Sequence, residues 1–266
     1  MCRWIAYKGK PTYLEELVFK PANSLVDQSL HCHEGKAQTN GDGFGIGWYG
    51  SVAEPGVFRE VLPAWNDINL QALTRQIRSR LFFAHVRAST GTETSRLNCH
   101  PFSYGRWLFM HNGQIGGYDK CRRQLENLLS DELFEKRLGS TDSELFFLLL
   151  IQNGLDGDPP AAIRSTIEQI NDISLSCECG EPFKLTICVA DGERLFACRY
   201  ASQGVAPTLY WKLQEKDVLI ASEPTEISDT QWNDVAENCF LTARDGVEVA
   251  NLFETGATEQ ASRKIA

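Results

Sequence analysis

The sequence predicts an α+β fold, a layered sandwich of mainly antiparallel sheets with helices packed on their faces. Strand-like segments rich in β-branched and aromatic residues come in runs at both ends of the chain, and helical patterns cluster in its middle. Regular alternation of strand and helix is missing from this pattern. Such alternation is typical of parallel sheets with crossover helices, so a sequence without it favours antiparallel pairing of the strands.

The expected strands combine apolar runs or alternation with turn residues at their ends. In chain order they cover residues 2–7, 44–50, 56–62, 81–88, 106–113, 183–191, 194–201, 208–213 and 217–222. The expected helices cover residues 69–79, 119–129, 140–153 and 159–171. The third has Ser140 or Thr141 as N-cap with Glu144 at capping-box distance, and the fourth begins with proline.

The length and composition are those of a globular protein. The 266 residues suffice for a sound core, and no repeat, low-complexity tract or flexible linker divides them, so we expect a single domain over residues 1–266. The net charge is −9 and no block of Lys and Arg stands out. This balance argues against nucleic acid or an anionic membrane as partner and favours a small-molecule substrate.

Membrane and export signals are not apparent in the sequence. The longest apolar run, "LFFLLLI" at residues 145–151, is too short to span a bilayer, and no basic region followed by an apolar stretch opens the chain. Nine cysteines, an odd number, indicate mostly reduced thiols. We therefore expect a cytoplasmic protein, and the oligomeric state stays open.

Cys2 directly follows the initiator methionine in "MCRW". Excision of Met1 would leave this residue with both a thiol and a free α-amine. A thiol reacts as its thiolate, and an α-amine of pKa about 7.7–8.0 is a base that can take the proton near neutral pH. The alternative is a chance cysteine, and Cys2 alone does not decide between the two.

Glycine occupies alternate positions in "NGDGFGIGWYG", from Gly41 to Gly47. A strand with this pattern has one face without side chains, against which another backbone or a ligand can lie. Both interpretations stay open at this point. The spacing matches neither a dinucleotide fingerprint nor a phosphate-binding loop, so we expect no nucleotide cofactor.

Three polar motifs adjoin strongly apolar segments. Arg87 ends an apolar strand and is suited to bidentate capture of a carboxylate, unless it forms a surface salt bridge. Asn112 and Gly113 can direct a side-chain amide and a backbone N–H at one oxygen, although an ordinary Asn-Gly turn is the alternative. Asp142 lies in the first turn of the helix expected at 140–153, where capping explains a carboxylate equally well.

Other candidate sites are weaker. Two segments carry metal-binding side chains without the spacing of a zinc site, so we expect no metal. They are His31, Cys32 and His33 in one segment and Cys177 and Cys179 in the other. His100 in "NCHPF" is interpreted as a structural residue that organises a loop. The chain lacks a G-x-S-x-G elbow, which argues against a serine hydrolase.

Taken together and in this order, the motifs resemble those of class II glutamine amidotransferases, which are N-terminal-nucleophile (Ntn) hydrolases. The matching segments span most of the chain: the Cys2 opening, "GDGFGIGW", "HVRAST", "HPF", "HNG" and "TDSE". The opening and the stretch "NGDGFGIGWY" are most similar to stand-alone, single-domain members such as the γ-glutamyl hydrolases of ergothioneine synthesis. The resemblance implies a four-layered αββα sandwich.

The resemblance also implies a catalytic mechanism that needs no cofactor. Processed Cys2 would attack a γ-carboxamide carbon while its own amine carries the proton. The Asn112 side chain and the Gly113 N–H would form the oxyanion hole. Ammonia or a larger amine would leave, and water would hydrolyse the γ-glutamyl thioester.

Substrate binding is implied in the same way. Arg87 would hold the substrate α-carboxylate and Asp142 its α-ammonium, and His100 belongs with these substrate-binding residues. One departure concerns Ala88, because members fused to a synthase usually have an aromatic residue after this arginine. The chain also leaves no room for a synthase domain, so ammonia transfer within one chain is not expected.

The leading hypothesis is an amidohydrolase that acts on glutamine or another γ-glutamyl amide. A second is the glutaminase subunit of a separate, ammonia-accepting synthase. A third is a catalytically silent protein that retains Met1 and binds γ-glutamyl ligands. A zinc or redox protein that uses the nine cysteines is the most distant alternative.

Overall fold

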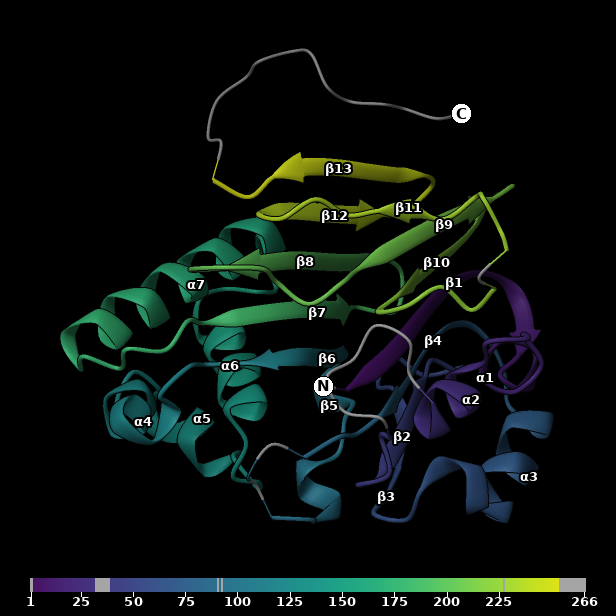
Figure 1. Ribbon diagram of the computed structural model, residues 1–266, viewed down its shortest axis with the longest axis horizontal. Coiled ribbons are helices and arrows are strands. Elements are labelled where there is room, and N and C mark those ends of the chain that lie inside the picture. The colour runs from purple at the N-terminus through teal and green to yellow at the C-terminus, as the bar shows by residue number, and fades with distance from the viewer. Residues whose placement is uncertain (1, 32–38, 90, 92, 227, 254–266) are drawn as a thin grey trace.

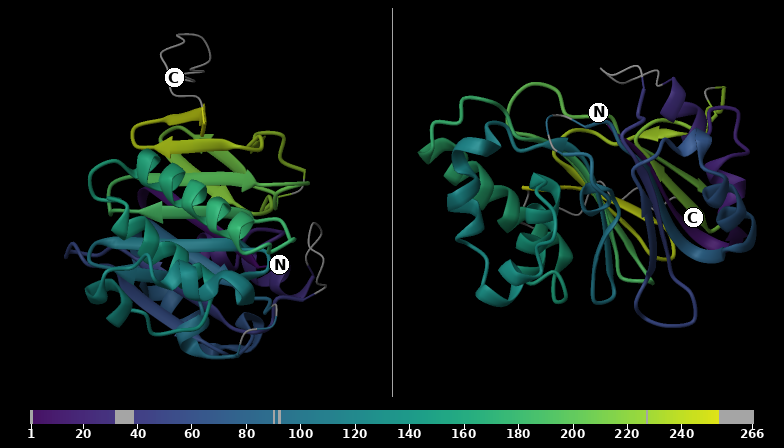
Figure 2. Two further views of the ribbon diagram at one scale, coloured as in Figure 1. Left: turned by 90° about the vertical axis from the view of Figure 1, so that its left-hand side faces the viewer. Right: turned by 90° about the horizontal axis from the view of Figure 1, so that it is seen from below.

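The structure, a computed structural model, describes residues 2–31, 39–89, 91, 93–226 and 228–253. They form four layers, in which two antiparallel sheets lie face to face and helices cover the outer face of each (Figures 1 and 2). This is the αββα sandwich that the resemblance implied, so the predicted fold class is confirmed.

The first sheet has seven strands in the order β11-β9-β10-β1-β4-β2-β3. They are β1 (Arg3–Tyr13), β2 (Phe44–Trp48), β3 (Gly56–Glu60), β4 (Arg78–Val86), β9 (Tyr210–Gln214), β10 (Asp217–Ala221) and β11 (Asn233–Asp234). The central strand β1 thus joins N-terminal strands to C-terminal ones. The outer face is covered by the helices α1 (Glu15–Val18), α2 (Leu25–Leu30) and α3 (Ile68–Gln76).

The second sheet has six strands in the order β13-β12-β8-β7-β6-β5. They are β5 (Phe102–Tyr104), β6 (Trp107–Gln114), β7 (Lys184–Ala190), β8 (Leu195–Ala201), β12 (Cys239–Ala243) and β13 (Val247–Asn251). Its outer face is covered by α4 (Tyr118–Glu126), α5 (Asp131–Glu135), α6 (Asp142–Gln152) and α7 (Pro159–Ser176).

Apolar side chains fill each space between neighbouring layers. Alternation along β1 shows how this arises, because Trp4 points between the two sheets and Ile5 points toward α1 to α3. On the other side, α6 is buried almost all round, which explains why its sequence is apolar at nearly every position.

The predicted strands and helices are all present, with shifted ends. The helix expected at 69–79 ends at Gln76, because Arg78 already pairs with Tyr13 in the ladder between β4 and β1. Thr141 is the N-cap of α6, since its hydroxyl accepts a hydrogen bond from the N–H of Glu144 at 3.1 Å. The α-helices and strands not predicted are short or near the C-terminus: α1, α2, α5, β5 and β11 to β13.

The glycine-rich strand β2 packs closely against another backbone. A Cβ atom at Gly45 would lie 2.1 Å from the carbonyl oxygen of His100, and one at Gly47 would lie 2.8 Å from the ring of Pro101. Of the two interpretations, the structure supports close packing. The missing side chains let the first sheet approach the segment that leads into β5 and β6.

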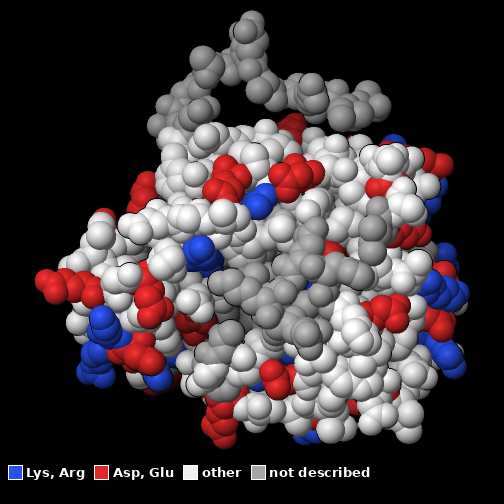
Figure 3. All heavy atoms as spheres, viewed as in Figure 1, with Lys and Arg blue, Asp and Glu red and all other residues white. Residues whose placement is uncertain are grey.

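The surface agrees with the charge pattern of the sequence. On the face shown in Figure 3, the described acidic and basic side chains are interspersed rather than gathered by sign. Among the described residues, no helix is long and apolar enough to cross a membrane.

Candidate active site

The register between β1 and β4 places Cys2 beside the segment that follows β4. Arg3 pairs with Val86, so the preceding residue, Cys2, lies beside the residues that follow β4, Arg87 and Ala88. The Cys2 Sγ accepts a hydrogen bond from the Ala88 N–H at 3.5 Å and lies 3.6 Å from the Ala88 carbonyl oxygen, to which the thiol donates. The thiol is therefore held at the end of the first sheet, adjacent to Arg87.

The surroundings of the thiol keep it protonated. Burial raises the pKa of the Cys2 thiol, while the Ala88 N–H and the guanidinium groups of Arg87 and Arg3 act in the opposite direction. Only a thiolate is a strong nucleophile, so a base would have to remove the proton for this thiol to react as one.

Arg87 is buried rather than at the surface, with an exposed fraction of 3%. One nitrogen of its guanidinium donates to the carbonyl oxygen of Asp42 at 3.2 Å. Another donates to the Ser89 hydroxyl and to the Glu93 carbonyl oxygen, each at 3.3 Å. These contacts hold the cation in a defined orientation beside Cys2.

Asn112 and Gly113 lie in strand β6, not in the turn that an Asn-Gly pair suggests. They pair with Thr186 and Leu185 of β7, which continues the ladder past both residues. Gly113 has φ +150°, and a Cβ atom there would lie 2.0 Å from the Lys184 carbonyl oxygen. Glycine is therefore required at position 113.

The side chain of Asn112 is buried and unpaired. It is 1% exposed, and within the part of the chain that the structure describes neither its amide nitrogen nor its oxygen has a hydrogen-bond partner. Buried amides are usually paired, because an unpaired one costs about 1–3 kcal/mol. An unpaired donor of this kind is available to a ligand.

Asp142 connects helix α6 to the end of β6. Its Oδ2 accepts a hydrogen bond from the Ile115 N–H at 2.8 Å, and its Oδ1 accepts one from the Ser143 hydroxyl at 3.3 Å. Ser143 in turn lies 2.8 Å from Nδ1 of His111, the residue before Asn112. The carboxylate is thus fixed at the same end of β6 as the Asn-Gly pair.

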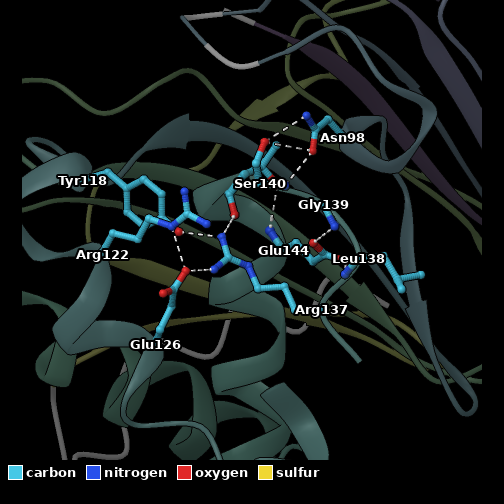
Figure 4. Close-up of polar contacts among 10 residues, drawn as sticks. Asn98, Tyr118, Arg122, Glu126, Arg137, Leu138, Gly139, Ser140 and Glu144 are labelled. Carbon is cyan, nitrogen blue, oxygen red and sulfur yellow. Dashed lines mark hydrogen bonds and ion pairs between the residues drawn. The ribbon is translucent and has the colours of Figure 1, made fainter. Parts of the chain in front are cut away.

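A polar network holds the segment that precedes Asp142 (Figure 4). The Glu144 carboxylate accepts hydrogen bonds from the N–H groups of Leu138 and Gly139 at 3.0 and 2.6 Å instead of closing a capping box. The Asn98 side chain accepts from the Ser140 N–H at 2.9 Å.

The same asparagine also reaches the arginine side of the site. Asn98 donates to the Glu93 carbonyl oxygen at 2.9 Å, and this oxygen also accepts from Arg87. A continuous chain of contacts therefore connects Arg87 to the N-terminus of α6. Sequence reasoning missed Asn98, because no motif marks it.

His100 lies in the interior between the sheets. Its ring stacks on His85 at a centroid distance of 4.3 Å, and among the described residues its two ring nitrogens have no hydrogen-bond partner. Burial lowers the pKa of His100 well below its usual range and that of His85 to about 3. The Nε2 of His85 lies 3.3 Å from the His111 carbonyl oxygen. This contact links β4 to β6 at the residues that precede Arg87 and Asn112.

The structure thus brings Cys2 and Arg87 together at the end of β4 and places Asn112, Gly113 and Asp142 at the end of β6, and the contact of His85 with the His111 carbonyl links these two strands. Of the metal-binding side chains considered from the sequence, Cys32 and His33 lie outside the described residues. The described His, Cys, Asp and Glu residues include no group of three or more that could hold a metal ion.

Comparisons with known proteins agree with this geometry. Residues 20–209 match the family model of "Glutamine amidotransferases class-II". The "Probable glutamine amidotransferase DUG3" of Saccharomyces cerevisiae is 32% identical over 92% of this chain and 82% of its own length. The "Gamma-glutamyl-hercynylcysteine sulfoxide hydrolase" of Mycolicibacterium smegmatis is 28% identical over 92% of this chain and 96% of its own length.

Solved structures show the same fold. A class-II glutamine aminotransferase domain protein from Silicibacter pomeroyi, 32% identical, superimposes with a TM-score of 0.74 over 95% of this chain and 100% of its own. The glutamine phosphoribosylpyrophosphate amidotransferase of B. subtilis has a TM-score of 0.68 at 15% identity, and the match covers 96% of this chain and half of that one. The relatives include amidotransferases and a γ-glutamyl hydrolase, which identifies the chain's chemistry as C–N amide hydrolysis. This chain belongs to the class II glutamine amidotransferases.

Proposed function

We propose that the protein hydrolyses the γ-amide of glutamine or of another γ-glutamyl amide, with Cys2 as an N-terminal nucleophile. One observation carries the proposal: the Asn112 amide is buried and, among the described residues, unpaired, and it directly follows His111, whose carbonyl oxygen lies 3.3 Å from His85 on the strand that leads to Arg87. An oxyanion at this place would accept a hydrogen bond from the Asn112 amide and remove the penalty of an unpaired buried donor.

The reaction proceeds in two steps. After removal of Met1, the α-amine of Cys2 takes the thiol proton, and Sγ attacks the γ-carbonyl carbon. Asn112 and the Gly113 N–H stabilise the oxyanion, and the same amine returns the proton to the departing nitrogen. A water molecule then attacks the γ-glutamyl thioester, which releases glutamate and restores the Cys2 thiol.

Two opposite charges select the γ-glutamyl part of the substrate. Arg87 has the planar geometry that binds a carboxylate through two hydrogen bonds, and Asp142 is suited to the α-ammonium group. His100 is proposed to support this substrate site from the interior. These contacts involve only the γ-glutamyl part, so they place no limit on the size of the leaving amine.

The cytoplasm is the compartment that fits this proposal. The eight cysteines of the described residues are all free thiols, as expected in a reducing environment. A relative whose printed name is a γ-glutamyl hydrolase aligns with nearly the whole chain, which favours a stand-alone hydrolase over an ammonia-delivering subunit.

The test combines the intact mass of the protein with its turnover. Protein lacking Met1 should release glutamate from at least one member of a panel of γ-glutamyl amides that includes glutamine. Cys2→Ala should abolish this release, whereas Cys177→Ala, which alters another partly exposed thiol, should not.

The other outcomes separate the alternatives. Full activity in Cys2→Ala would refute the nucleophile. Turnover that needs an added synthase would favour the glutaminase subunit. Binding of γ-glutamyl ligands without turnover by protein that retains Met1 would favour the silent protein.

A further inference from the structure

A buried ion pair adjoins the proposed nucleophile. Arg3 is fully buried, and its Nε donates to Oε2 of Glu223 at 3.0 Å; the two side chains are 1% and 3% exposed. The Nη1 of the same guanidinium donates to the carbonyl oxygen of Cys2 at 3.0 Å. One arginine thus bridges a buried carboxylate and the peptide group of Cys2.

The carboxylate end of this bridge is itself anchored. Glu223 directly follows Ser222, whose N–H donates to the Trp4 carbonyl oxygen at 3.0 Å and whose hydroxyl accepts from the Trp4 N–H at 2.8 Å. The Asn23 side chain donates to Glu223 Oε1 at 3.4 Å and to the Pro224 carbonyl oxygen at 2.6 Å. Three segments remote in sequence therefore meet behind Cys2.

Stability does not by itself explain such a pair. Transferring two charges into the interior is unfavourable, and apolar residues of similar size often serve equally well. By contrast, the second residue of a chain is ordinarily mobile, and misplacing a reacting atom by about 1 Å can reduce a rate about 100-fold. A residue that must present both a thiol and an α-amine needs to be held.

We propose that Arg3 and Glu223 are positioning residues that hold the Cys2 peptide group, so that its thiol and α-amine face the oxyanion donors. The inference rests on the proposed function. The Arg3 contact fixes the carbonyl side of Cys2, and the Ala88 N–H and carbonyl fix Sγ. With these two points held, the α-amine has a defined place relative to the thiol.

The first test is kinetic. Arg3→Lys keeps the charge but loses the planar fork that reaches two acceptors at once. We expect kcat to fall by at least about tenfold while KM changes by less than about twofold, because the proposed substrate contacts are made by other residues. Glu223→Ala should lower kcat similarly, and the double variant should be no worse than the poorer single variant, since both act through one displacement of Cys2.

The control is Asp191→Asn. This substitution breaks another ion pair with a buried carboxylate, Asp191 with Arg194, in the turn between β7 and β8. This turn lies at the other end of β6 from the proposed site. It follows Ala190, which pairs with Leu108, and Leu108 is six residues away from Gln114 at the end of β6 near the proposed site. Its kcat should stay within about twofold of the unaltered protein. An unchanged kcat in Arg3→Lys, or independent multiplication of the single effects, would overturn the inference.

The second test does not require turnover. Iodoacetamide alkylation is followed at Cys2 and at Cys99, a fully buried thiol, by peptide mapping. Burial raises the pKa of the Cys2 thiol, so release of this residue into solvent should speed its alkylation at least about threefold in Arg3→Lys while Cys99 stays protected.

The two readouts distinguish the inference from a loss of folding and from failure of the proposed function. Faster alkylation of both cysteines, or of neither, contradicts a positioning role. Faster alkylation of Cys2 alone, in a protein that hydrolyses no γ-glutamyl amide, upholds the positioning role and refutes the function. If Arg3→Lys does not fold, Glu223→Gln, which nearly keeps the shape of the side chain, takes its place in both tests.

Discussion

Asn112 and Asn98 form a matched pair for testing the idea that the site retains an unpaired amide at the expense of stability. Their exposed fractions are 1% and 2%, so changing either to alanine removes the same atoms from similarly buried places. Asn98 makes three hydrogen bonds to Glu93 and Ser140 at 2.9 to 3.1 Å and a longer one of 3.5 Å with the Ser140 hydroxyl. Asn112 makes none with its side chain among the described residues.

The expected difference follows from these contacts. At about 1 kcal/mol for each hydrogen bond, Asn98→Ala loses about 3 kcal/mol more than the removed atoms account for. Asn112→Ala loses no hydrogen bond and removes a buried amide whose lack of partners costs about 1–3 kcal/mol. The two variants should therefore differ by about 4 kcal/mol or more in the free energy of unfolding, which corresponds to roughly 10 °C in melting temperature.

Urea unfolding and thermal melts of both variants, monitored by circular dichroism, measure this difference. In parallel, Asn112→Ala should lose about 100-fold to 1,000-fold in kcat on a γ-glutamyl amide, as expected for one oxyanion donor. Equal destabilisation of the two variants would show that Asn112 has stabilising partners in the folded protein and would refute the reasoning. A stable Asn112→Ala protein with full activity would refute its role in the oxyanion hole.

Three further predictions concern backbone geometry, pH and substrate binding. Gly113→Ala should destabilise the protein by about 2–5 kcal/mol, because it combines an unfavourable φ with a clash against β7. The control Gly105→Ala, at a position with φ +52° and open space around it, should destabilise the protein by only about 1–2 kcal/mol. Similar melting temperatures for the two variants would contradict this prediction. The buried histidines His85 and His100 have lowered pKa values, so the unfolded chain binds more protons below pH 6.5. The free energy of unfolding should therefore fall by up to about 1.4 kcal/mol per histidine for each pH unit below 6.5, and for His85 this continues down to about pH 3. Equal urea midpoints at pH 7 and pH 5.5 would rule this out. Asp142→Asn should raise KM for γ-glutamyl amides about 10-fold to 100-fold, because the variant loses the charge that binds the α-ammonium group. For glutaric acid monoamide, which lacks the α-amino group, KM should rise by less than about twofold. An equal rise in KM for both substrates would argue against ammonium binding.

Much of the fold could be predicted because its main elements have strong local signals. The apolar strands that became β4, β6 and β7 and the capped helix α6 are long and regular in pattern. The helices α1, α2 and α5 have four to six residues, too few for a periodic pattern to emerge. The end of α3 was misplaced, because pairing of Arg78 with β1 decides where the helix must stop.

Local sequence also suggested alternatives that only the environment could decide. An arginine after a strand is often at the surface, yet Arg87 is buried and donates a hydrogen bond to the Glu93 carbonyl oxygen. An Asn-Gly pair usually forms a turn, yet β7 extends far enough to keep Asn112 and Gly113 in a strand. In both cases the deciding partner lies far away in sequence.

By itself, the sequence determined the layered fold class, the family resemblance and the residues of the candidate site, since these depend on residue type, order and spacing. The tertiary structure decided which of those residues meet and what supports them. The contacts of Arg3 with Glu223 and of Asn98 with Ser140 join positions 220 and 42 residues apart. Such contacts arise from strand order and loop packing, and residue spacing along the chain carries no record of them.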